Sequence, residues 1–180
     1  MSYTSIILSG LPASGKTTLA QKLSSYYHWP IHSLGQLWRN QWKEKFPQEE
    51  ISFENYWRQT SLADNREINR KAKEIFKRGE VIGDSRYTLY CKDLPSLLIF
   101  VTAPLEIRAS RSAEKYPEMS QLDRKKILKE RERDEVERGR QIFGENYDYR
   151  EHHHYHLTLN SGVLTIEQEF NLVKSLMETQ

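Results

Sequence analysis

Short apolar runs alternate with longer stretches of helical periodicity along the chain. The apolar runs, which are strand-like, cover residues 6–8, 29–32, 80–83, 97–101 and 155–159. The stretches between them predict helices at about 17–27, 34–46, 52–78, 104–115, 120–143 and 165–177. Strands that alternate with helices indicate an α/β fold, in which a parallel sheet of five strands is flanked by helices on both faces. In such folds the carboxyl ends of the strands line a ligand crevice.

Two segments are predicted to extend from this single domain over the crevice, at about 36–70 and 112–138. The first is rich in aromatic residues, with Trp38, Trp42 and Phe46 spaced by four. This spacing predicts a helix whose aromatic stripe packs on its neighbours, and the alternative is that one ring stacks on a ligand base. The second segment is highly charged, which is typical of a solvated helix face.

The composition of the 180 residues argues against several classes of protein. Charged residues make up 29% and the net charge is +2, which gives no reason to expect nucleic-acid binding. The single cysteine, Cys91, cannot form an internal disulfide and suits a reducing compartment. No apolar run is long enough to span a membrane, and the N-terminus has no signal-peptide pattern. We therefore expect a soluble cytoplasmic protein that binds neither nucleic acid nor membrane and is a monomer or a simple homodimer.

One motif near the N-terminus has the spacing of a phosphate-binding loop. Residues 10–17 read G-L-P-A-S-G-K-T, which fits the pattern G-x-x-x-x-G-K-[ST]. Its glycines let backbone N–H groups turn toward phosphate oxygens, and the N-terminus of the helix that follows also attracts anions. Lys16, expected to be exposed to the ligand, supplies positive charge, and the Thr17 hydroxyl suits Mg²⁺. The sequence thus predicts that nucleotide phosphates are bound by Gly10, Pro12, Ala13, Ser14, Gly15, Lys16, Thr17 and Thr18.

The arginines outside this motif bear on the reaction. No N-K-x-D sequence for reading guanine is present, and the length favours phosphate transfer to a small acceptor over mechanical work. A hydroxyl acceptor usually needs a carboxylate base, for which Asp84 is a candidate, whereas a phosphate acceptor needs arginines to hold it. A phosphate acceptor is favoured by the number of arginines, which are Arg39, Arg86, Arg108, Arg111, Arg131, Arg133, Arg138 and Arg140.

Several stretches together resemble the cytidylate kinase family of nucleoside monophosphate kinases, through most of the chain. They are S-G-L-P-A-S-G-K-T-T-L-A at 9–20, L-G-Q-L-W-R at 34–39, V-I-G-D-S-R at 81–86, I-F-V-T-A-P-L-E-I-R-A-S-R at 99–111 and R-E-R-D-E-V-E-R at 131–138. The resemblance implies a P-loop kinase core with an acceptor-binding segment at about 36–70 and a lid at about 112–138. It also implies ATP with Mg²⁺ as the donor and CMP or dCMP as the acceptor.

The resemblance assigns roles to four arginines. It places Arg39 and Arg86 at the acceptor phosphate, and Arg131 and Arg138 in the lid, where they would meet the transferring group. The two lid arginines are seven residues apart, so both can face the crevice from one side of a helix. Arg133 and Arg140 would point elsewhere.

Further residues complete the expected site. Asp134 or Glu135 would orient an arginine or contact the acceptor, and Arg108 would lie on the donor side. Thr17, with Asp84 acting through water, would hold Mg²⁺.

Three other functions are left open by the residues. The first is a kinase for a small hydroxylated metabolite, with Asp84 as its base. The second is a nucleotide-binding regulator with little turnover. The third, an RNA-binding or partner-binding module, is disfavoured by the near-zero net charge.

Two further sequence features are not expected to carry chemistry. His152–His154 and His156 enter a strand, and adjacent histidines do not easily converge on one ion without an acid or cysteine to complete a set. Cys91 has no evident base partner, so a catalytic thiol is not expected.

Overall fold

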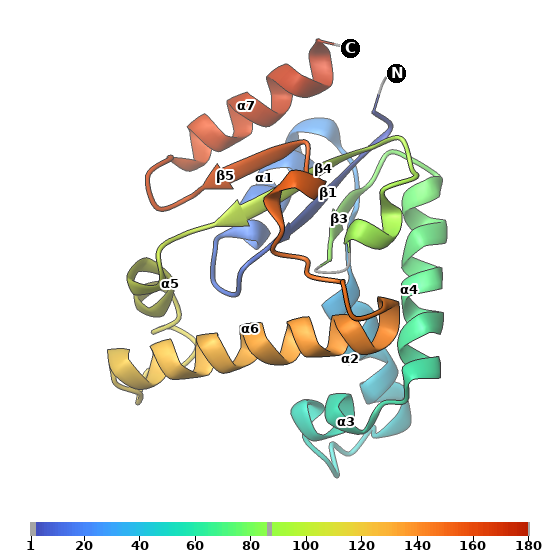
Figure 1. Cartoon of the computed structure of the whole chain (residues 1–180), viewed down its shortest axis with the longest axis vertical. Coiled ribbons are helices and arrows are strands. Elements are labelled where there is room, and N and C mark those ends of the chain that lie inside the picture. The colour runs from blue at the N-terminus through green and yellow to red at the C-terminus, as the bar shows by residue number, and fades with distance from the viewer. Residues whose placement is uncertain (1–2, 86–87, 180) are drawn as a thin grey trace.

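A five-stranded parallel sheet forms the centre of the molecule (Figure 1). The computed structural model describes residues 3–85 and 88–179. The strand order is β2-β3-β1-β4-β5. The strands are β1 (Ser5–Gly10), β2 (Ile31–Ser33), β3 (Ile82–Asp84), β4 (Ser96–Thr102) and β5 (Leu157–Asn160). All neighbouring strands pair in parallel, so the predicted sheet is confirmed.

Each face of the sheet is covered by its own set of helices. Ile6 and Leu8 of the central strand are fully buried in a cluster shared with α1 (Lys16–Tyr27) and α7 (Ile166–Glu178). Ile7 points to the opposite face, as the two-residue period of a strand requires. Because β1 is the middle strand of the sheet, its carboxyl end lies in the middle of the sheet edge, where the phosphate loop begins.

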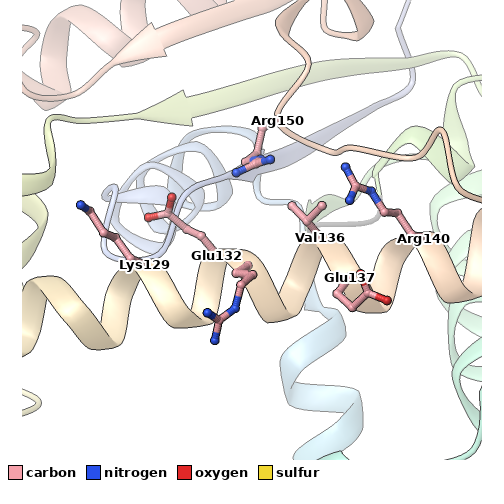
Figure 2. Close-up of a pocket in the computed structure, with 7 residues that line it drawn as sticks. Lys129, Glu132, Val136, Glu137, Arg140 and Arg150 are labelled. Carbon is pink, nitrogen blue, oxygen red and sulfur yellow. The ribbon is translucent and has the colours of Figure 1, made fainter.

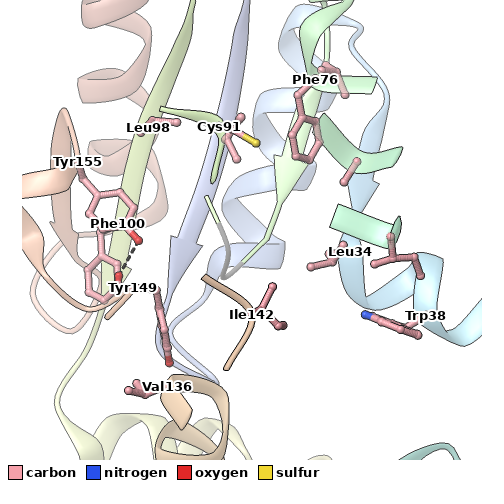
Figure 3. Packing of buried hydrophobic residues seen from close by; sticks show 14 of the residues in the cluster. Leu34, Trp38, Phe76, Cys91, Leu98, Phe100, Val136, Ile142, Tyr149 and Tyr155 are labelled. Carbon is pink, nitrogen blue, oxygen red and sulfur yellow. Dashed lines mark hydrogen bonds between the residues drawn. The ribbon is translucent and has the colours of Figure 1, made fainter. Parts of the chain in front are cut away.

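The second face is covered by α2 (Leu34–Lys45), α4 (Leu62–Lys77) and α6 (Gln121–Phe143). Figure 3 shows the cluster beneath them, in which Phe76 of α4 and Val136 of α6 approach the strands. Tyr149 and Tyr155 come from the connection between α6 and β5, and both rings lie near Phe100 of β4. This connection therefore forms part of the core.

The predicted helix at 52–78 is wrong in one respect, because the structure divides it into α3 (Phe53–Gln59) and α4. Ser61 begins α4 with a capping box, in which its hydroxyl accepts from Asp64 N at 3.1 Å. The Asp64 carboxylate accepts in return from Ser61 N at 3.0 Å. These reciprocal bonds favour a new helix start, and they leave Thr60 at the corner between α3 and α4.

The predicted helix at 104–115 is also shorter in the structure, where α5 covers Leu105–Arg111. The aromatic residues of the 36–70 segment do pack on their neighbours, as predicted. Trp38, Trp42 and Tyr56 are buried, and the rings of Trp38 and Tyr56 meet edge to face at 6.2 Å. These rings hold α2 and α3 together.

Cys91 lies in the short helix η1 (Thr88–Cys91) and is buried. Burial raises the pKa of its thiol to about 12, so the thiol is neutral at physiological pH. Within residues 3–85 and 88–179, no helix combines the length and the apolar character needed to cross a bilayer.

Gly10 is required where β1 meets β4. Its φ is +143°, and a Cβ placed there would lie 2.0 Å from the Val101 carbonyl oxygen. We expect Gly10→Ala to lower the free energy of unfolding by more than about 4 kcal/mol in urea denaturation, because backbone must move. Gly144→Ala is the matched control, since φ is +107° but nothing lies within 4 Å of its Cβ. It should cost only about 1–3 kcal/mol of backbone strain, and equal losses would contradict the steric argument.

Candidate active site

The phosphate loop joins the end of β1 to the start of α1. Gly15 precedes the helix with φ +92°, and Ala13 within the loop has φ +59°. Leu11 N donates to Val101 O at 3.2 Å, which fixes the loop against β4. The first N–H groups of α1 have no partner within their own helix, so they form an anion site at the end of the central strand.

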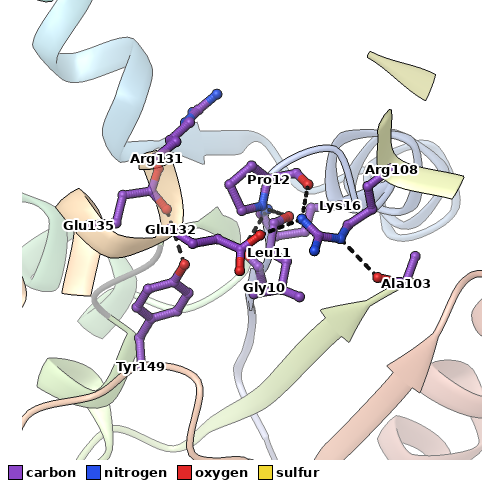
Figure 4. A network of polar contacts seen from close by, with 10 residues as sticks. All are labelled: Gly10, Leu11, Pro12, Lys16, Ala103, Arg108, Arg131, Glu132, Glu135 and Tyr149. Atoms are coloured by element: carbon purple, nitrogen blue, oxygen red, sulfur yellow. Dashed lines mark hydrogen bonds and ion pairs between the residues drawn. The ribbon is translucent and has the colours of Figure 1, made fainter. Parts of the chain in front are cut away.

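Lys16 is buried in this loop rather than exposed, which corrects the expectation from sequence. Only 7% of the residue is exposed. Its Nζ donates to Gly10 O at 3.0 Å and to Leu11 O at 3.1 Å (Figure 4). The positive charge of Lys16 is therefore held at the loop by two backbone carbonyls. Thr17 and Thr18 of the first helical turn are exposed.

Arg108 connects the phosphate loop to α6. It lies on α5 and is buried, and its Nε donates to Ala103 O at 2.8 Å. Its Nη1 donates to Pro12 O at 3.2 Å and to Glu132 Oε1 at 2.6 Å. Figure 4 shows the Glu132 carboxylate next to the loop. Arg108 thus contacts the phosphate loop at Pro12. Glu132 is a residue that sequence reasoning did not single out.

Arg111 supports the other side of the loop through Ser161. Its Nη1 donates to Ser161 Oγ at 2.7 Å, and Ser161 Oγ donates to Ser14 O at 2.6 Å. The Ser14 hydroxyl is buried, and among the described residues none hydrogen-bonds to it. Burial also raises the pKa of Glu169 on α7, while nearby Arg111 opposes that rise. Ser161 follows β5, and only its place after a strand could have indicated it.

Glu135 of α6 is buried and holds Arg131 in place. Glu135 Oε1 accepts from Arg131 Nε at 2.9 Å, and its Oε2 accepts from the Tyr149 hydroxyl at 3.1 Å. The Tyr155 hydroxyl in turn donates to Tyr149 O at 2.6 Å, and burial raises the Tyr155 pKa to about 12. Both carboxylate oxygens are engaged within the chain, so the geometry favours a role for Glu135 in orienting an arginine.

Arg138 lies seven residues after Arg131 but meets a different part of the molecule. Its Nη2 donates to the carbonyl and, at 2.8 Å, to the hydroxyl of Thr60. Its guanidinium lies over the Trp57 ring, 5.6 Å from the centroid. The structure therefore joins Arg138 to the corner between α3 and α4 and not to the phosphate loop.

The remaining expected residues lie at the edges of this region. Asp84 ends β3 beside Leu8 of β1 and is half-buried. Arg39 is exposed on α2, with its guanidinium 5.2 Å from the Phe53 ring. Asp134 is exposed on α6 and pairs with Arg133 at 3.7 Å. Arg86, expected at the acceptor phosphate, lies outside the described residues.

A magnesium ion fits the residues at the ends of β1 and β3. The exposed Thr17 hydroxyl and the half-buried Asp84 carboxylate offer the oxygen ligands that Mg²⁺ prefers. Asp84 ends β3, which pairs with β1, and Thr17 lies in the first turn of α1, directly after the loop that would hold the phosphates.

A shallow pocket of about 290 Å³ adjoins the Arg108–Glu132 contact. Figure 2 shows Glu132 and Arg140 leaving α6 on the side that faces Arg150. Arg150 hydrogen-bonds to Asp148 and keeps the pKa of that carboxyl below its usual range. Cationic side chains predominate in the lining of the pocket, which consists of Lys129, Glu132, Arg133, Val136, Glu137, Arg140 and Arg150.

Comparisons with known proteins bear on the family and the fold of this chain. The profile of the cytidylate kinase-like family matches residues 5–163. A cytidylate kinase of Methanocaldococcus jannaschii is 30% identical over 177 residues, which cover 96% of this chain and 97% of that protein. One of Methanopyrus kandleri is 28% identical over 189 residues, with 96% and 92% covered. A shikimate kinase structure from Bacteroides thetaiotaomicron has a TM-score of 0.63 at 15% identity, covering 97% of this chain and 98% of its own, which shows the P-loop kinase fold.

Replacing Lys16 tests the loop as the donor site. Lys16→Met keeps the length of the side chain but removes the charge. ADP release from ATP with an acceptor should fall about 10²–10³-fold, as when one preorganised donor is lost. Lys22→Met is the control, because Lys22 lies on the same helix and its charge pairs with the exposed Glu167. Near-normal turnover of Lys16→Met would exclude this loop as the donor site.

Proposed function

The chain belongs to the cytidylate kinase-like family, and we propose that it transfers the γ-phosphate of ATP to a nucleoside monophosphate, with CMP or dCMP as the acceptor. In this reaction an acceptor phosphate oxygen forms a bond to the γ-phosphorus. The bond from that phosphorus to the β,γ-bridging oxygen breaks, and ADP leaves. The products are two nucleoside diphosphates when the donor is ATP.

The observation that carries the proposal is that one helix, α6, contacts two separate binding segments. Through Glu132 it meets Arg108, which also binds the phosphate loop at Pro12 O. Through Arg138 it meets Thr60, within the segment expected to bind the acceptor. In Figure 1, α6 lies between the sheet and α3. A helix in this position can cover a donor and an acceptor together and exclude water from the transfer.

The donor half of the proposed site is built from the phosphate loop and its supports. Backbone N–H groups of residues 13–18 and the Lys16 ammonium would bind the β- and γ-phosphates. Arg108 would balance charge on the donor side, beside Pro12. Mg²⁺, held by Thr17 and through water by Asp84, would neutralise charge on the phosphates.

The acceptor half of the proposed site relies on arginines. Arg39 on α2 and Arg86 would hold the acceptor phosphate by charge-assisted hydrogen bonds. Arg131 is the lid arginine proposed to meet the transferring group, because Glu135 fixes it at its Nε and leaves the end of the guanidinium for a ligand. Arg138 would instead connect the lid to the acceptor segment through Thr60. The choice of CMP or dCMP rests on the names of the relatives.

A second function is favoured by one specific position. Asp84 stands half-buried at the carboxyl end of β3, next to the end of β1, where a base could take a proton from a hydroxyl acceptor. The same fold occurs in a shikimate kinase, although that likeness concerns the fold alone. The acceptor test below separates the two functions.

The acceptor is identified by a coupled assay of ADP release across CMP, dCMP, UMP, AMP, GMP, common sugars and hydroxy acids. We expect activity on nucleotides, because arginines outnumber candidate bases around the site, and the highest kcat/KM with CMP or dCMP, because the relatives are named cytidylate kinases. Lys16→Met is the control, since it should lower the activity seen with the best acceptor about 10²–10³-fold. Activity on a sugar or hydroxy acid, with none on any nucleotide, would refute the proposed function and favour Asp84 as a base.

The contact between Tyr149 and Glu135 is expected to position Arg131. Tyr149→Phe removes the hydroxyl that donates to Glu135 Oε2 and should lower kcat about tenfold, because a hydrogen bond to a charged group is lost. KM for ATP should change little, since the phosphate loop is untouched. The control is Tyr116→Phe, on a side chain far from Glu135 in sequence. An unchanged kcat, or an equal fall in the control, would show that this contact serves stability alone.

A further inference from the structure

We propose that Glu151, His153 and His154 form a binding site for one divalent transition-metal cation of the zinc type. The three residues lie at the short helix η2 (His152–His154), in the connection between α6 and β5. The sequence alone argued against a metal here because no acid completed the set. The structure supplies that acid in Glu151, and the site takes no part in the proposed phosphate transfer.

The three ligand atoms already lie close to the spacing that a metal requires. Glu151 Oε2 is 3.1 Å from His154 Nε2 and 3.7 Å from His153 Nε2. All three ligand atoms lie within 4.8 Å of one another. A tetrahedral ion with bonds of about 2.0–2.1 Å holds its ligand atoms about 3.4 Å apart. Small rotations of these side chains are therefore sufficient to close the set around one ion.

The backbone of η2 is fixed while its ligands remain accessible. His154 N donates to Glu151 O at 3.2 Å, and the ring of His152 lies 4.9 Å from that of Phe100 in the core. The side chains of Glu151, His153 and His154 are 45%, 71% and 34% exposed. An ion can reach them from solvent, and water can fill the coordination positions that remain.

The ligand chemistry selects the class of cation. Two imidazole nitrogens and one carboxylate oxygen suit Zn²⁺, Co²⁺, Ni²⁺ or Cu²⁺, whereas Mg²⁺ prefers oxygen ligands and keeps its waters. The site is therefore distinct in its preference from the oxygen groups near Thr17 and Asp84. The competing explanation is an ion pair between Glu151 and a protonated histidine, which requires no metal.

Calorimetric titration of the untagged full chain with Zn²⁺, in excess Mg²⁺, tests the proposal directly. We expect one ion per chain, and binding that weakens as the pH falls, because bound histidines must be neutral. Co²⁺ should bind the same site and report its coordination by visible absorption. Glu151→Gln, His153→Ala and His154→Ala should each weaken binding about 10–100-fold or more, since each removes a ligand.

His28→Asn is the matched control, because His28 is exposed, lies at the end of α1, and has φ +58°, which asparagine tolerates. Its Zn²⁺ affinity should equal that of the unaltered chain. Circular dichroism confirms that the exposed substitutions leave the fold intact. Absence of Zn²⁺ binding, equal affinity in all variants, or one ion shared by two chains would overturn the proposed site.

Discussion

The buried guanidinium of Arg108 determines how the parts of this molecule meet. It takes the carbonyls of Pro12 and Ala103 and the carboxylate of Glu132 as partners, so one charge joins the phosphate loop, α5 and α6. A buried charge that loses its counterion is costly, about 3–5 kcal/mol in comparable pairs. The position of α6 is therefore linked to the phosphate loop. In the proposed function, a bound polyphosphate would bring a competing anion to the same region, so donor binding and the position of α6 would be thermodynamically linked.

The second constraint on α6 is its contact with the corner at Thr60. That corner exists because Ser61 and Asp64 form a capping box, which starts α4 and ends the continuity with α3. The Thr60 carbonyl and hydroxyl oxygens then accept from Arg138, while Asn65 Nδ2 donates to the same hydroxyl at 3.1 Å. A local preference of four residues thus creates the surface that α6 contacts through Arg138. If α6 moves as the proposed lid, it must break these bonds or carry the corner with it.

The sequence sufficed for features that repeat or that follow a fixed spacing. The strands, the phosphate loop and its helix were predictable because apolar runs and the glycine-lysine pattern are local. Tyr149 and Glu132 were not, because their partners, Glu135 and Arg108, are set by how the α6–β5 connection and α5 pack. The burial of Lys16 was also missed, since its carbonyl partners depend on the path of the loop. Helical spacing predicted that Arg131 and Arg138 lie on one face of a helix. In the structure they contact different partners, Glu135 and Thr60.

The two halves of the proposed site differ in how strongly the fold constrains them. The proposed donor half is fixed by backbone: the Val101 carbonyl leaves no space at Gly10, and the loop carbonyls bind Lys16 and Arg108. The proposed acceptor half includes side chains, such as Trp57 beneath Arg138, on the short helix α3 beside its corner with α4. Substitutions can replace these side chains without moving the sheet, but no substitution replaces a backbone carbonyl of the loop. Divergence among relatives in the acceptor they use should therefore map to residues 53–62 and the face of α6 that meets them, with the donor loop unchanged.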